Sequence, residues 1–121
     1  MLGGVNMITD FGKELRILRV ERDENISTMA KKLGISIEYL SAIESGNRPI
    51  PSDLVEKIIE KYHLSKERRE LLREKEAISS KKIDIDLEMV TSEQRKLVFA
   101  LSRKLQNLSD QDCLTILDKI K

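Results

Sequence analysis

One stretch of the chain, residues 25–51 (NISTMAKKLGISIEYLSAIESGNRPIP), restricts the fold more than any other part of the sequence. Apolar residues recur there in two series at helical spacing, and Gly34 separates the two series. Glycine tolerates the positive φ that a tight turn requires. Ser36 follows the turn, where its hydroxyl can accept hydrogen bonds from the free N–H groups of a new helix. The stretch therefore predicts two short helices joined by a tight turn, with the second helix at residues 36–45.

Together with its neighbours, this stretch resembles the Cro/repressor (Xre-like) helix-turn-helix family of bacterial and phage regulators. The resemblance spans residues 11–64 and rests on four segments in order: LRILR, MAKKLGIS, YLSAIESG and NRPIP, the last followed by an amphipathic helix. It implies an all-α, five-helix domain that binds double-stranded DNA. Residues 36–45 would then form the recognition helix, which lies in the major groove in proteins of this kind.

Composition limits the class of protein. Of the 121 residues, 40% are hydrophobic and 36% are charged, and no apolar run approaches the ~20 residues needed to cross a bilayer. The opening residues, MLGGVNMITDFG, lack the basic and apolar regions of a signal peptide. The lone Cys113 excludes a disulfide within the chain and is typical of a reducing compartment. We therefore expect a cytoplasmic protein with one compact domain and a smaller appendage, and no contact with a membrane.

Charge is almost balanced along the chain. There are 22 Lys and Arg residues against 21 Asp and Glu residues, and up to Ser65 nine basic residues stand against ten acidic ones. Neutralisation of phosphates dominates non-specific affinity for DNA, and a DNA-binding surface is usually basic. This balance predicts a modest affinity for each monomer and therefore a reliance on dimerisation.

The sequence predicts four parts in order. Residues 1–9 are expected to be flexible, and residues 10–78 to form the DNA-binding domain, whose charged fifth helix starts after Ser65. Residues 79–90 are expected to form a linker or extended segment, and residues 91–121 a C-terminal helical hairpin.

Residues 82–90 (KIDIDLEMV) alternate between apolar and acidic side chains, a period that is typical of extended chain. A single strand is not stable alone in a helical protein. Two alternatives follow from this. The segment pairs with the same strand of a second subunit, or it runs across the helices as an extended linker.

The C-terminal residues predict two amphipathic helices. The first follows a capping box formed by Thr91 and Gln94, and the second begins after Ser109 with acidic residues in its first turn. Two short helices bury too little apolar surface to be stable alone, so we expect the hairpin to mediate a homodimer or to bind another protein. The residues predicted to make this contact are Leu97, Leu101, Leu105, Leu117 and Ile120.

The resemblance assigns the groove-facing side of the recognition helix to Ile37, Glu38, Ser41 and Ala42. This set departs from the usual pattern, because it contains no Arg, Lys, Gln or Asn to make a bidentate contact with a base. A carboxylate can still accept from a cytosine amino group, a serine can bond to several bases, and an apolar side chain can contact a thymine methyl group. We therefore expect weak base readout or a dependence on DNA shape.

Phosphate contacts are expected from two places. Hydroxyls and free N–H groups at the start of the first motif helix can meet a phosphate, and the resemblance implies that the loop after the recognition helix contacts the sugar-phosphate chain. The residues predicted to contact phosphate are Ser27, Thr28, Lys31, Asn47 and Arg48.

Two charged residues are expected to have a structural role. Arg19 and Glu44 match positions that form an ion pair in the family that the chain resembles. That pair would hold the first helix of the domain against the recognition helix and would not read sequence.

Nothing in the sequence favours an enzyme. Its single His and single Cys lie far apart, so they provide neither a metal cluster nor a nucleophile–base pair, and no glycine-rich phosphate loop is present. We expect no catalytic residue, no metal and no cofactor. The preferred function is a homodimeric transcriptional repressor that reads a pseudo-palindromic operator through residues 36–45. The alternative is a protein-interaction module, such as the antitoxin of a toxin–antitoxin pair, in which DNA binding is secondary.

Overall fold

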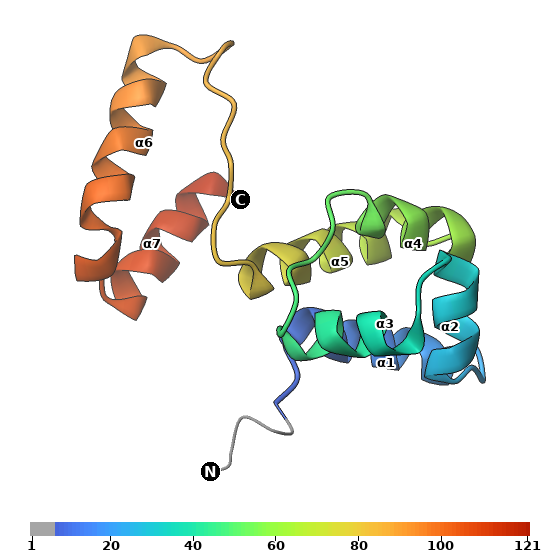
Figure 1. Cartoon of the computed structure of the whole chain (residues 1–121). Coiled ribbons are helices and arrows are strands. Elements are labelled where there is room, and N and C mark those ends of the chain that lie inside the picture. The colour runs from blue at the N-terminus through green and yellow to red at the C-terminus, as the bar shows by residue number, and fades with distance from the viewer. Residues whose placement is uncertain (1–6) are drawn as a thin grey trace. The chain divides into compact units, whose positions relative to one another are not determined.

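The computed structural model describes residues 7–121 of the chain, and its helices fall into two compact units that divide between Ile83 and Asp84. Figure 1 shows both units. The described residues form helices and no strand, which confirms the predicted all-α fold. The helices of the first unit are α1 (Asp10–Glu21), α2 (Ile26–Leu33), α3 (Ile37–Ser45), α4 (Leu54–Tyr62) and α5 (Lys66–Ser79). Those of the second unit are α6 (Ser92–Lys104), the short 3-10 helix η2 (Leu105–Asn107) and α7 (Asp110–Ile120).

Local capping explains where most helices of the first unit begin. Four of them follow a polar residue whose side chain accepts a hydrogen bond from the backbone N–H three residues ahead: Thr9, Asn25, Ser36 and Ser65. Helix α4 is the exception. Its N-cap residue makes no side-chain hydrogen bond, and the helix begins at Leu54, three residues after Pro51.

Glycine ends both helices of the central motif. Gly34 follows α2 with a φ of 72°, and Gly46 follows α3 with a φ of 82°. This left-handed conformation costs glycine little, because glycine has no Cβ. The expected turn at Gly34 is therefore present, and it sets the direction in which α3 leaves α2.

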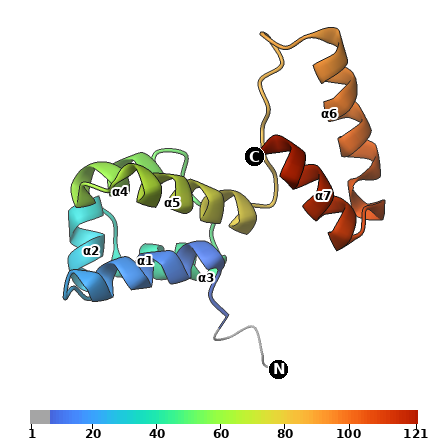
Figure 2. The ribbon, with the colours of Figure 1, turned by 180° about the vertical axis from the view of Figure 1, so that it is seen from behind.

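All five helices of the first unit contribute to one core. Helix α1 packs against α3 and α5, while α2 packs against α3 and α4, as Figures 1 and 2 show from opposite sides. The largest fully buried side chains are those of Tyr62, Phe11, Leu15, Met29, Leu40, Ile43, Ile58 and Val55.

The end of α5 contacts the start of α1 through a polar group. The hydroxyl oxygen of Ser79 accepts a hydrogen bond of 3.0 Å from the backbone N–H of Phe11. The neighbouring Ile78 is 59% exposed, so it does not belong to the buried stripe of α5. The buried part of that stripe ends with Leu72, because the last turns of α5 lie beyond the core.

The expected flexible segment, residues 1–9, needs correction at its end. Residues 1–6 lie outside the described residues. Thr9 is anchored, because its backbone N–H and its hydroxyl both donate to the backbone carbonyl of Glu44 at 3.0 Å. This segment therefore helps to join α1 to the end of α3.

The second unit has no core of its own. Both of its α-helices begin at a capping box, formed by Thr91 with Gln94 and by Ser109 with Asp112, but neither helix contains a buried residue. Among the residues expected to contact a partner, Leu101 is half-buried and the other four are exposed. Residues 82–87 form no regular structure, as expected of a linker, and pairing of this segment between two copies stays a prediction.

Candidate nucleic-acid interface

Helix α3 is held to α1 by a buried ion pair. Arg19 is 7% exposed and Glu44 is 3% exposed. The Nη2 of Arg19 donates to Oε1 of Glu44 at 3.2 Å, and its Nη1 donates to Oε2 of the same carboxylate. Arg19 Nη1 also lies 3.3 Å from the sulfur of Met29 in α2. The Arg19 guanidinium therefore connects α1 with both α2 and α3, and this connection fixes the orientation of α3.

A close approach of the two backbones reinforces this contact. Gly12 in α1 lies so near α3 that a Cβ placed on it would be only 2.3 Å from the carbonyl oxygen of Glu44. Sequence reasoning missed this residue. A glycine inside a helix costs about 1 kcal/mol relative to alanine, which is a signal of close packing at that position.

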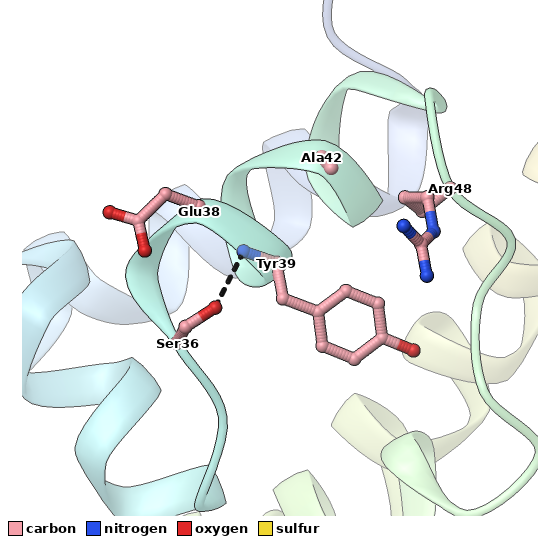
Figure 3. Close-up of a pocket in the computed structure, with 5 residues that line it drawn as sticks. All are labelled: Ser36, Glu38, Tyr39, Ala42 and Arg48. Atoms are coloured by element: carbon pink, nitrogen blue, oxygen red, sulfur yellow. Dashed lines mark hydrogen bonds between the residues drawn. The ribbon is translucent and has the colours of Figure 1, made fainter.

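The outward face of α3 carries the residues expected to face a DNA groove. Glu38 and Ser41 are exposed, Ile37 is 41% exposed and Ala42 is half-buried. The opposite face carries Leu40 and Ile43, which are fully buried. Within residues 7–121, the side chains of Glu38 and Ser41 make no hydrogen bond to the protein (Figure 3 shows the Glu38 carboxylate pointing outward), so both are free to bond to an external group.

Arg48 is held beside this face by an aromatic ring. A shallow hollow is lined by Ser36, Glu38, Tyr39, Ala42 and Arg48, as Figure 3 shows. The guanidinium carbon of Arg48 lies 5.4 Å from the centre of the Tyr39 ring, which is a cation–π distance. Tyr39 is half-buried against the core, and it also orients the arginine that follows α3.

Glu38 does not neutralise Arg48. In Figure 3 the Glu38 carboxylate points away from the Arg48 guanidinium, and no ion pair joins them. Asn47 is exposed next to Arg48, and both backbone N–H groups donate to the carbonyl of Ala42 at the end of α3. The loop therefore presents an amide and a positive charge close to the outward face of α3.

Three residues of α2 were also expected to contact phosphate. Ser27, Thr28 and Lys31 are all exposed. The hydroxyl of Thr28 donates to the side-chain oxygen of Asn25 at 3.0 Å, and the same oxygen accepts the backbone N–H of Thr28 at 2.9 Å. Because a phosphate oxygen can only accept, the Thr28 hydroxyl would have to leave Asn25 to donate to phosphate. Ser27 and Lys31 carry no such restriction.

Lys32, which follows Lys31, belongs to a different cluster. Its ammonium group pairs with Glu24 and lies 4.7 Å from the centre of the Tyr62 ring. The hydroxyl of Tyr62 donates to Glu24 at 2.6 Å. Burial alone would raise the pKa of Glu24, but the hydrogen bonds from Lys32 and Tyr62 outweigh it and hold this pKa below its usual value. The cluster therefore joins the loop before α2 and the end of α2 to the end of α4.

Five helices in this order, with the second and third joined at a glycine turn and the outward face of the third left free, define the helix-turn-helix class of DNA-binding domain. A comparison with protein families agrees. The family model described as "Helix-turn-helix domain" matches residues 10–72, just over half of the chain. The chain belongs to this family, in agreement with its Xre-like features. Neither the curated proteins nor the solved structures that were compared contain a match to this chain.

Within residues 7–121, no three His, Cys, Asp or Glu side chains come together in a way that could hold a metal ion. In the same residues, no helix combines the length and the apolar character needed to span a membrane.

Proposed function

We propose that this protein is a transcriptional regulator, and specifically a homodimeric repressor that reads a pseudo-palindromic DNA operator with α3. One observation carries the proposal. The inner side of α3 is locked to α1 through Glu44, while the outward side chains of Glu38 and Ser41 are exposed and bond to nothing in the described chain. A helix that is rigidly held on one side and free on the other is suited to reading base edges. Such a regulator would act in the cytoplasm.

The chemistry of the outward face predicts which bases it reads. The Glu38 carboxylate can only accept hydrogen bonds, so it favours the amino group of cytosine. Ile37 is apolar and 41% exposed at the first turn of α3, which suits contact with a thymine methyl group. Ser41 can donate or accept and discriminates less. Since none of these contacts is bidentate, the proposed specificity per half-site is modest.

Contacts with the sugar-phosphate backbone would supply much of the affinity for DNA. Arg48 and Asn47 lie beside the outward face of α3, and Ser27 and Lys31 are exposed on α2. These residues are the proposed phosphate contacts. Because the first unit is nearly neutral overall, two such units in one dimer would bind DNA far better than one. In a dimer the two α3 helices would read half-sites about 34 Å apart.

The test is binding to DNA from the region upstream of the protein's own gene, compared with scrambled DNA across a salt series. The variant Arg48→Ala is compared with Lys66→Ala, which removes an exposed charge from α5. We expect sequence-dependent binding that weakens in Arg48→Ala and does not change in Lys66→Ala. The slope of log K against log salt concentration should be shallower by about one in Arg48→Ala, because one phosphate contact is lost.

A second function is favoured by a different observation. The outward face of α3 lacks a bidentate base-reading side chain, whereas α6 and α7 expose several large apolar residues. This combination suits an antitoxin or another protein-interaction module whose DNA binding is secondary. Equal and feeble binding to operator and scrambled DNA would reject the repressor and favour this alternative.

A further inference from the structure

The two helices of the second unit have large apolar side chains that nothing in that unit covers. Leu97 in α6 is 61% exposed and Ile120 in α7 is 73% exposed. Figures 1 and 2 both show α6 and α7 diverging from the turn that joins them, and the two helices have no extended contact with each other. The remaining large exposed apolar side chains of α6, η2 and α7 are Phe99, Leu105, Leu114 and Leu117.

Helices of this length are not stable without a partner surface. Helix α6 has 13 residues and α7 has 11, and isolated helices shorter than about 12–15 residues are marginal in water. The capping boxes at Thr91 and Ser109 define where the helices start, but each cap contributes only about 1 kcal/mol. The stability of the second unit therefore requires that its exposed apolar side chains be covered.

The charges on the two helices indicate what covers them. Helix α6 carries four basic residues and one acidic residue, Glu93, so it is positive overall. Helix α7 carries three acidic residues and one basic residue, Lys119, so it is negative overall. The basic residues of α6 are Arg95, Lys96, Arg103 and Lys104, and the acidic residues of α7 are Asp110, Asp112 and Asp118. Pairing α6 with α7 therefore brings unlike net charges together, whereas two copies of α6 would place like charges together. In an antiparallel pair, the basic end of α6 meets the acidic start of α7.

We infer that α6 of one copy packs antiparallel against α7 of a second copy, so that the two C-terminal units form an intertwined four-helix bundle. A two-fold axis makes this contact twice, because each copy supplies one α6 and one α7. The contact buries Leu97, Leu105, Leu117 and Ile120. This inference rests on the homodimer in the proposed function, but it does not depend on DNA binding.

The experiment is a charge exchange, followed by analytical ultracentrifugation of the full chain without DNA. The first variant combines Lys96→Glu and Lys104→Glu in α6, and the second combines Asp110→Lys and Asp118→Lys in α7. Each variant alone gives α6 and α7 net charges of the same sign, so both contacts of its own dimer become repulsive. We expect each to dimerise at least ~tenfold more weakly than the wild-type chain.

Mixing the two variants separates contacts between copies from contacts within one chain. In the mixed dimer, the acidic α6 of the first variant meets the basic α7 of the second, and the other contact keeps its original charges. Dimerisation should therefore return close to the wild-type strength in the equimolar mixture. A double variant of the first unit, Lys13→Glu with Lys66→Glu, changes the same number of exposed lysines and should dimerise like the wild type in this assay.

Three results would overturn the inference. They are a monomeric wild-type chain, variants that dimerise as strongly as the wild type, and a mixture that stays as weak as the separate variants. The last result would mean that α6 and α7 pair within one chain or that their charges do not act across the interface. DNA binding is measured separately, so failure of this inference and failure of the proposed regulator can be told apart.

Discussion

Arg19 and Glu44 lie 25 residues apart in the sequence, yet their side chains form a two-bond ion pair in the interior between α1 and α3. Removing one partner leaves the other charge buried and unpaired, which usually costs about 3–5 kcal/mol. We therefore expect Glu44→Ala to lower the free energy of unfolding by an amount in this range. Arg16, which approaches the same carboxylate at 3.9 Å, also loses this partner in the variant. Urea unfolding followed by circular dichroism measures the change.

An apolar replacement of both partners is the control for this prediction. Arg19→Met combined with Glu44→Leu leaves no unpaired charge, so this double variant should be more stable than Glu44→Ala alone. Unchanged unfolding of Glu44→Ala would show that the ion pair does not hold α3 in place.

Gly12→Ala separates helix propensity from packing. If the space beside Gly12 were open, alanine in place of glycine inside the helix would stabilise α1 by about 1 kcal/mol. The added Cβ would lie 2.3 Å from the carbonyl oxygen of Glu44, so α1 must move away from α3. We expect a net loss of about 1–3 kcal/mol in the free energy of unfolding. The exposed neighbour Lys13→Ala is the matched control, and a more stable Gly12→Ala would contradict the close approach.

The contact between Tyr39 and Arg48 predicts a graded effect on DNA binding. Tyr39→Phe keeps the ring face beneath the guanidinium, while Tyr39→Leu removes it. A cation–π contact at an exposed site contributes about 0.5–1 kcal/mol, so Tyr39→Leu should weaken DNA binding about two- to fivefold and Tyr39→Phe very little. Fluorescence anisotropy with operator DNA measures both affinities.

A double variant tests whether Tyr39 acts through Arg48. If it does, Tyr39→Leu should add almost nothing to the loss already caused by Arg48→Ala. Equal losses in Tyr39→Phe and Tyr39→Leu would instead mean that the phenol hydroxyl, and not the ring face, is needed for binding.

The cluster around Glu24 predicts how stability depends on pH. Although burial opposes ionisation, the hydrogen bonds from Lys32 and Tyr62 hold the pKa of Glu24 below its ordinary value of 4.5. A carboxyl whose pKa is lowered by folding stabilises the folded state above its ordinary pKa, and this contribution is lost as the pH falls through the lowered value. The stability advantage of the wild type over Glu24→Gln should therefore shrink as the pH is lowered below about 4.5.

Urea unfolding at a series of pH values between about 6 and 3 measures this difference, within the range where carboxylates titrate. Glu60→Gln, which removes an exposed carboxylate from α4, is the matched control for the loss of one acidic group. A gap between wild type and Glu24→Gln that stays constant over the whole range would contradict the prediction.

Much of the secondary structure follows from residues close together in the chain. Asn25, Ser36 and Ser65 cap the helices that begin after them, and Thr91 forms the expected capping box with Gln94. Gly34 takes the positive φ expected of it. These features are predictable because each depends on a backbone conformation or on a hydrogen bond that spans only three residues.

Most helix starts and the helix-turn-helix class were thus determined by the sequence itself, since caps, turns and apolar spacing are local; α4, which has no side-chain cap, is the exception. The tertiary structure alone decided which side chains remain free for DNA. Lys32 turns to Glu24 and Tyr62, Tyr39 supports Arg48, and Gly12 admits the backbone of Glu44. These contacts join residues that are eight or more positions apart in the sequence, beyond the span of a helix cap or a turn, so no local pattern predicts them.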